Sequence, residues 1–154
     1  LVALATRSGD FSVGVAAFPD PHPASMSAQV DVEVLRAKQE AGAEFAITQF
    51  FFKSSAYFQL VDRARAGGVT IPIIPGIMPV TNLAQITRFA SLSGADFPAD
   101  IAAEFERVGD DYVRDLGIEM ASRLCRELLE GGAPGLHFYT LNRSTATRDI
   151  YANL

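Results

Sequence analysis

Four short apolar runs, each followed by a polar, proline or glycine break and then by a helical pattern, constrain the fold of this chain most. The runs cover residues 11–18, 45–52, 69–77 and 135–141. None of them alternates cleanly between apolar and polar residues, which is typical of parallel strands that are covered on both faces. The alternation of strands and helices predicts an α/β fold with right-handed parallel crossovers.

Helical spacing of apolar residues separates the four runs. Helices are predicted at residues 27–41, 54–66, 82–93, 99–108 and 115–130, with a helical remnant at each end of the chain. Four parallel strands form either half of an eight-strand barrel or part of an open sheet. No Gly-x-Gly-x-x-Gly sequence follows a strand, which weakens the case for a dinucleotide-binding open sheet. We therefore predict a parallel βα barrel of the TIM type.

Composition narrows the class of protein further. The 154 residues, 49% of them hydrophobic, suit one compact domain. A net charge of -5 with scattered basic residues argues against a nucleic-acid partner, and no apolar run approaches the ~20 residues that span a bilayer. The single Cys125 excludes an internal disulfide and suits a reducing compartment such as the cytoplasm. The chain does not begin with Met, and we expect it to be part of something longer.

Polar side chains at the predicted strand ends are the candidate functional groups, because active groups of βα barrels lie at the carboxyl ends of strands. His22 stands between two prolines, which restrict its backbone. It either donates a hydrogen bond to a ligand or caps a nearby turn. Gln49 interrupts an apolar run, and its amide either binds the edge of a heterocycle or satisfies neighbouring backbone.

Other candidates have equally open interpretations. Lys38 follows the first strand and either reaches a phosphate or lies solvated on a helix face. Tyr139 and Arg143 follow the fourth strand and either bind an aromatic or anionic ligand or bridge loops. Phe89 has the spacing of a core residue, and Cys125 lies on an apolar helix face with no basic neighbour to activate it.

Several catalytic patterns are absent from the sequence. It contains no His/Cys cluster at metal spacing, no Gly-x-Ser-x-Gly elbow, no phosphate loop and no obvious pair of acid/base carboxylates. We therefore predict no metal site, and these absences argue against a self-contained hydrolase.

The segments AAFPDPHP, FAITQFFF, IPIIPGIMPVTN and GLHFYTLNRS, in this order, resemble the second half of methylenetetrahydrofolate reductases. The resemblance implies an eight-strand βα barrel that binds FAD and uses NADH or NADPH to reduce 5,10-methylenetetrahydrofolate to 5-methyltetrahydrofolate. The four strands would be the fifth to eighth, with the N-terminal half of the barrel outside this chain. A cytoplasmic, homo-oligomeric flavoprotein oxidoreductase of one-carbon metabolism and methionine biosynthesis is implied.

The resemblance also assigns roles to residues. Those that would bind FAD are Ala16, Phe18, His22, Asp31 and Lys38. Those that would bind folate, with Phe89 stacking on nicotinamide or folate in turn, are Gln49, Gln85, Phe89, Tyr139 and Arg143. The sequence departs from the family pattern at Phe18, where a Tyr is expected, and at Val34 and Ala37, where polar or basic contacts to FAD are expected.

The family's general acid, a Glu on the first strand, and its Arg-Gly-Asp loop after the fourth strand are not in this sequence. The resemblance therefore implies no catalytic residue within this chain, and we expect the isolated chain to be inactive. One alternative is a non-catalytic half-barrel that pairs with a copy of itself, or binds folate or nucleotide without turnover. Another is an aldolase-type barrel, which needs a Schiff-base lysine at a strand end. The only lysines, Lys38 and Lys53, lie outside the predicted strands.

Overall fold

Four parallel strands form one sheet at the centre of the chain. The structure is a computed structural model, and it describes residues 1–22, 24–84, 86–88, 97–142 and 145–154. The strands pair in the order β1-β2-β3-β4, with every neighbouring pair parallel. Their bounds are β1 (Gly14–Ala17), β2 (Phe45–Phe50), β3 (Ile73–Ile77) and β4 (His137–Phe138). The predicted α/β class with a parallel sheet is confirmed.

Helices connect the strands. They are α1 (Val2–Arg7), α2 (Ala28–Glu40), α3 (Ser54–Ala66), α5 (Ala99–Val108), α6 (Val113–Glu130) and α7 (Thr145–Ala152), with a 3-10 turn η1 (Asp110–Tyr112) before α6. Residues 83–84 and 86–88 are also helical, and the rest of the helix predicted at 82–93 lies outside the described residues. The predictions of 54–66 and 99–108 are confirmed at both ends.

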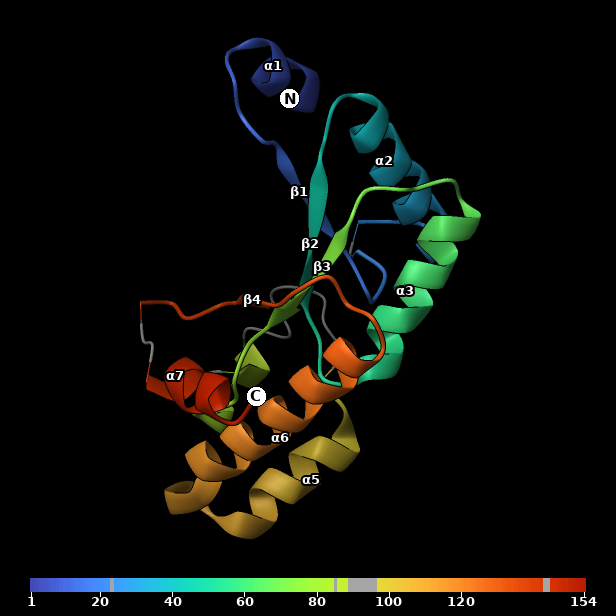
Figure 1. Cartoon of the computed structure of the whole chain (residues 1–154). Helices are drawn as coiled ribbons and strands as arrows, with labels where there is room; N and C mark the ends of the chain where they lie inside the picture. Colours follow the sequence, from blue (N-terminus) through green and yellow to red (C-terminus); the bar gives the residue numbers. More distant parts are fainter. Residues whose placement is uncertain (23, 85, 89–96, 143–144) are drawn as a thin grey trace.

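Helices α2, α3 and α6 follow one another along the same side of the sheet (Figure 1). This arrangement follows from the strand order, because right-handed crossovers between sequential parallel strands place every connecting helix on one face. The carboxyl ends of all four strands consequently lie at one edge of the sheet, where the polar residues predicted from the sequence follow them.

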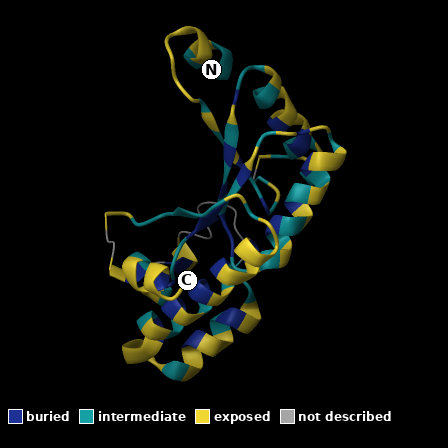
Figure 2. Cartoon of the chain, viewed as in Figure 1, coloured by how far each residue is buried: buried dark blue, intermediate teal, exposed yellow. Residues whose placement is uncertain are grey.

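The two faces of the sheet differ in burial. In β2, Ala46, Thr48 and Phe50 are buried, whereas Phe45, Ile47 and Gln49 between them are only half-buried. Burial therefore alternates along β2, whereas every residue of β3 except Ile74 is buried. The prediction of strands covered on both faces is wrong for β2 and agrees with β3. Helix α1 has no buried residue, as its yellow and teal ribbon shows (Figure 2).

Two apolar clusters support the sheet. The larger lies between the strands and the helices, and it joins Ile73 and Ile77 of β3 to Leu60 of α3 and to Cys125 and Leu128 of α6. Cys125 is fully buried, and burial raises the pKa of its thiol to about 11, which confirms its place in the core. The smaller cluster packs residues at the carboxyl ends of the strands against α5 and α6.

The strands are shorter than predicted because pairing, and not apolar character, sets their ends. The run at 11–18 pairs only from Gly14, and Phe11 is 60% exposed. The run at 135–141 contributes two residues to the sheet, after which Leu141 and Asn142 take φ angles of 49° and 61°. A leucine in this left-handed region costs roughly 1–2 kcal/mol, so the turn after β4 is held by its surroundings.

Candidate functional site

The five residues predicted to bind a cofactor line one cavity at the carboxyl end of β1. We call it the His22 cavity; its volume is about 260 Å³. Its walls come from the end of β1, the loop that follows and the first three turns of α2. The lining residues are Ala16, Ala17, Phe18, His22, Ala24, Ser25, Val30, Asp31, Val34, Leu35, Lys38 and Leu60.

His22 is fixed by its own loop and by α2. Its backbone N–H donates to Asp31 Oδ2 at 3.0 Å, and its Nδ1 accepts from the backbone N–H of Ala24, also at 3.0 Å. The Phe18 ring meets the imidazole edge-on, with 4.6 Å between ring centroids. Because Nδ1 accepts a hydrogen bond, the proton of the neutral ring lies on Nε2. The turn-capping interpretation is thus confirmed, and it leaves Nε2–H as a donor.

Lys38 reaches from α2 across to β1. Its Nζ donates to the carbonyl oxygen of Ala16 at 2.9 Å, and the side chain lies half-buried on the wall of the His22 cavity. Burial lowers the pKa of this amine from 10.5, and the neighbouring Asp31 carboxylate partly offsets that shift. The interpretation as a solvated helix-face lysine is therefore wrong. One of its three donors is used, and the others remain for an acceptor in the cavity.

Arg63 of α3 holds the loop after β1, and sequence reasoning missed it. Its Nη2 donates to the carbonyl oxygen of Pro19 at 3.1 Å, while its Nε is buried and has no hydrogen-bond partner among the described atoms. Nothing in the local sequence distinguishes Arg63 from other charged residues of α3. Only the packing of α3 beside this loop reveals the contact.

A second cavity lies at the carboxyl ends of β3 and β4. We call it the Tyr139 cavity; its volume is about 240 Å³. It lies at the same edge as the His22 cavity, with β2 and β3 between β1 and β4, roughly 14 Å across at ~4.8 Å per strand. Its lining residues are Met78, Pro79, Thr81, Asn82, Ile86, Arg114, Tyr139, Thr140, Leu141, Thr145, Ala146 and Thr147.

Tyr139 is tied to the strands through its hydroxyl and its backbone. The hydroxyl donates to the carbonyl oxygen of Thr48 at 2.9 Å, and the backbone N–H donates to the carbonyl oxygen of Ile77 at 2.8 Å. Burial raises the pKa of the phenol. Its ring meets those of Phe50 and His137 edge-on. The hydroxyl is thus committed to the protein, and the ring faces the cavity.

Thr48 and Gln49 are consecutive residues near the end of β2, and their side chains point to opposite faces of the sheet. The Gln49 Oε1 accepts from the backbone N–H of Phe50 at 3.1 Å, and its Nε2 has no hydrogen-bond partner among the described residues. Thr48 is fully buried, and its Oγ1 accepts from the backbone N–H of Gly76 at 2.9 Å. Sequence reasoning missed Thr48, although Thr48 and Gln49 are the two polar residues of the same apolar run.

Three predicted folate-binding residues, Gln85, Phe89 and Arg143, lie outside the described residues. Of the other two, Tyr139 lines the cavity named after it, whereas Gln49 lines neither cavity. The Tyr139 hydroxyl donates to the carbonyl of Thr48, the residue before Gln49 in the chain. Within the described ranges, no group of three His, Cys, Asp or Glu side chains is placed to hold a metal ion. No helix in that part of the chain is long and apolar enough to cross a membrane.

A parallel α/β sheet with two cavities along its carboxyl edge defines a class of proteins whose ligands bind at strand ends. Comparison with known proteins narrows this class. The chain matches the methylenetetrahydrofolate reductase family model over residues 1–154, and it belongs to that family. This is the family that the resemblance of the sequence segments predicted, and that prediction is confirmed.

Comparison with individual relatives supports the family assignment. The chain is 42% identical to the 5,10-methylenetetrahydrofolate reductase of Escherichia coli, covering 94% of this chain and 49% of that protein. It is also 42% identical to a probable methylenetetrahydrofolate reductase (NADPH) of Caenorhabditis elegans, covering 94% of this chain and 22% of that protein. The chain thus spans about half the length of the bacterial relative.

A solved structure shares the fold at low sequence identity. It is an uncharacterized protein from Clostridium thermocellum that binds two copies of 5-methyl-5,6,7,8-tetrahydrofolic acid. The TM-score is 0.63 at 16% identity, over 94% of this chain and 52% of that one. This likeness supports the fold alone.

Proposed function

We propose that the chain supplies part of the cofactor and substrate site of an enzyme that reduces 5,10-methylenetetrahydrofolate to 5-methyltetrahydrofolate. FAD is the proposed cofactor, and NADH or NADPH the proposed electron donor. The observation that carries the proposal is the assembly of Ala16, Phe18, His22, Asp31 and Lys38 around one cavity in a chain of this family.

The His22 cavity fits part of a flavin nucleotide. When bound, FAD would accept hydride from the nicotinamide and deliver it to the folate. The Lys38 ammonium offers charged donors to a phosphate, and the His22 Nε2–H offers a neutral donor nearby. Ala16 has no side chain beyond Cβ, so it leaves room against the strand end. A volume of about 260 Å³ suits one portion of the cofactor and not the whole molecule.

The folate would lie farther along the same edge. The Gln49 amide has its Nε2–H₂ donors available, which suits the acceptor atoms on the edge of a pterin. The Tyr139 ring would pack against the ligand while its hydroxyl stays on Thr48. Gln85, Phe89 and Arg143 complete the proposed folate set, as does stacking of Phe89 on the nicotinamide or folate.

The remaining catalytic groups are proposed to lie in a preceding half of the barrel. The bacterial relative is about twice as long as this chain, and β1 and β4 each have one neighbour within the described sheet. The face of β2 that carries Phe45 and Ile47 is only half-buried. A second set of strands would cover this face, close the barrel and bring the general acid Glu. Loss of a general acid typically lowers a rate by ~10²–10⁴.

The test compares this chain with the complete product of its gene. Both are purified, desalted and examined for the visible absorbance of bound flavin, and then assayed for oxidation of NADH or NADPH that depends on 5,10-methylenetetrahydrofolate. We expect flavin and turnover in the complete product and no turnover in the chain alone. A complete product without flavin would refute the assignment of FAD. Turnover by the chain alone would refute the proposal that the general acid lies outside this chain.

A non-catalytic half-barrel is the second candidate, favoured by the same half-buried sheet face. Such a module would pair with a copy of itself and bind folate or nucleotide without turnover. Sedimentation equilibrium separates the candidates, because this alternative requires a gene product of 16.6 kDa that forms a dimer. A longer gene product that turns over folate excludes it.

A further inference from the structure

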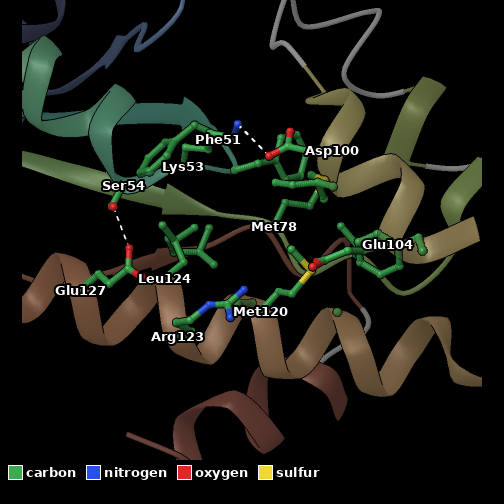
Figure 3. A pocket seen from close by; sticks show the side chains of 17 residues that line it. Phe51, Lys53, Ser54, Met78, Asp100, Glu104, Met120, Arg123, Leu124 and Glu127 are labelled. Atoms are coloured by element: carbon green, nitrogen blue, oxygen red, sulfur yellow. Dashed lines mark hydrogen bonds and ion pairs between the residues drawn. The ribbon is translucent and has the colours of Figure 1, made fainter. Parts of the chain in front are cut away.

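A third cavity, larger than the two described above, lies between α5 and α6. We call it the α5–α6 cavity; its volume is about 320 Å³. Besides the two helices, its walls come from the segments that follow β2 and β3 (Figure 3). No proposed cofactor or folate residue that the structure describes lines it, and the proposed function does not use it. The lining residues nearest the sheet are Ile77, the last residue of β3, and those that follow β2 and β3 directly.

The floor of the α5–α6 cavity is apolar and buried. Phe51, Ile77 and Phe105 are each no more than 2% exposed, and the half-buried Met78 and Met120 lie over them. A floor of this kind favours an apolar ligand body through the area it removes from water.

Gly117 explains why α6 lies so close to this floor. A Cβ atom at Gly117 would overlap the carbonyl oxygen of Val80, so only glycine lets the helix approach the segment after β3. The cavity wall on the α6 side is therefore fixed by backbone packing.

Two corners of the rim are already closed by polar contacts. Lys53 Nζ lies 3.0 Å from Asp100 Oδ2, and the Ser54 hydroxyl donates to Glu127 Oε2 at 2.6 Å, as the dashed lines in Figure 3 show. These charges have partners within the protein and do not call for a ligand.

Arg123 and Glu104 differ from the rest of the rim. Arg123 reaches over the floor from α6 and Glu104 from α5 (Figure 3). Both residues are exposed, and neither has a hydrogen bond or an ion pair with any described residue. One unpaired cation and one unpaired anion thus stand on facing helices above an apolar floor.

We propose that the α5–α6 cavity binds a small zwitterion with an apolar body, namely an α-amino acid with an aromatic or long aliphatic side chain. Its carboxylate pairs with Arg123, its ammonium pairs with Glu104, and its side chain covers Phe51, Met78 and Met120. A simple anion would face the Glu104 carboxylate, and a simple cation would face the Arg123 guanidinium. Either ligand would also leave one rim charge desolvated without a partner.

The experiment uses three probes that share one apolar body. L-phenylalanine carries both charges, 3-phenylpropanoate only the carboxylate and phenethylamine only the ammonium. Each is titrated into protein labelled with ¹³C at the methionine methyl groups. The chain contains 3 methionines. Met120 lines this cavity and not the Tyr139 cavity, Met78 lines both, and Met26, 94% exposed, serves as an internal control. A shift of Met120 is therefore required to place the ligand in the α5–α6 cavity. Signals are assigned with Met→Leu variants.

We expect L-phenylalanine to shift the Met78 and Met120 signals, leave Met26 unchanged, and bind about fivefold more tightly than either single-charge analogue. In Arg123→Gln, L-phenylalanine and phenethylamine should bind within about twofold of each other; in Glu104→Gln, L-phenylalanine and 3-phenylpropanoate should do so. The matched controls Arg107→Gln and Glu106→Gln change exposed residues of α5 outside the cavity and should retain the preference.

Three results would overturn the proposal: no shift at any accessible concentration, equal binding of all three probes, or a preference that survives both rim substitutions. The readout is binding, so it is independent of flavin content and turnover. The amino-acid site can therefore fail while the proposed reductase function stands, and the reverse.

Discussion

The His22 and Tyr139 cavities are built in different ways, although both lie at the carboxyl edge of one sheet. At the first, the polar contacts among the predicted cofactor residues stay within one βα unit: His22 and Asp31 are 9 residues apart, and Lys38 and Ala16 are 22 apart. Only the Arg63 contact to Pro19, which holds the loop, comes from the next unit of the chain. At the second, the Tyr139 hydroxyl binds a carbonyl 91 residues away. The difference teaches that the first region can be changed with little effect on stability, whereas the second is part of what assembles the sheet.

Gly76→Ala tests the region of the Tyr139 cavity and has the largest expected effect. A Cβ at Gly76 would overlap the carbonyl oxygen of Thr48 and lie 2.6 Å from Cε2 of Tyr139. Because backbone and a packed ring must both shift, we expect the free energy of unfolding to fall by about 3 kcal/mol, measured by urea denaturation. Gly135→Ala is the control, since a Cβ there meets nothing within 4 Å, and it should change stability by less than ~0.5 kcal/mol. Equal midpoints for the two variants would contradict this account.

Lys38→Met tests the first region. The substitution keeps the apolar stem and removes the ammonium, so flavin affinity should fall about tenfold while the free energy of unfolding stays nearly constant. Fluorescence titration of the apoprotein with FAD measures the affinity. The control is Lys53→Met, which removes the chain's only other lysine, an exposed one paired with Asp100. If both variants bind flavin like the parent, Lys38 has no part in the cofactor site.

Tyr139→Phe separates support of the sheet from ligand binding. The hydroxyl is occupied by the Thr48 carbonyl, so its removal should lower the free energy of unfolding by about 1 kcal/mol and change folate affinity less than about twofold. Tyr112→Phe, at a residue 64% exposed, should change neither quantity. A sharp fall in folate affinity with an unchanged unfolding midpoint would contradict the claim that the Tyr139 hydroxyl supports the sheet and not the ligand.

The smallest expected effect is a pH dependence at Lys38. Burial lowers its pKa in the folded protein below 10.5, so the folded state binds this proton more weakly than the unfolded state does. The stability penalty is fully present below the lowered pKa and is relieved as pH rises from there towards 10.5. Flavin affinity should weaken over the same window, because the ammonium is lost. The free energy of unfolding, measured across a pH series, should show this rise in the parent protein and not in Lys38→Met. The same profile in both proteins would refute the assignment of the rise to Lys38.

Local sequence determined the helices and the class of fold. Apolar spacing and the Gly67-Gly68 stop predicted α3, and α5 was predicted at both ends, because helical hydrogen bonds connect residues four apart. Likewise the cofactor set gathered at one cavity, since β1, its loop and α2 are consecutive in the chain. The family resemblance was also carried by contiguous segments.

Tertiary structure alone decided the rest, because those features depend on partners far away in the chain. Pairing with β3 reduced the run at 135–141 to His137 and Phe138, and Thr48 acquired its role from Gly76 and Tyr139. Arg123 and Glu104 look like ordinary helix-surface charges in the sequence. They face one cavity only because Gly117 lets α6 lie against the segment after β3, and no local pattern encodes that approach.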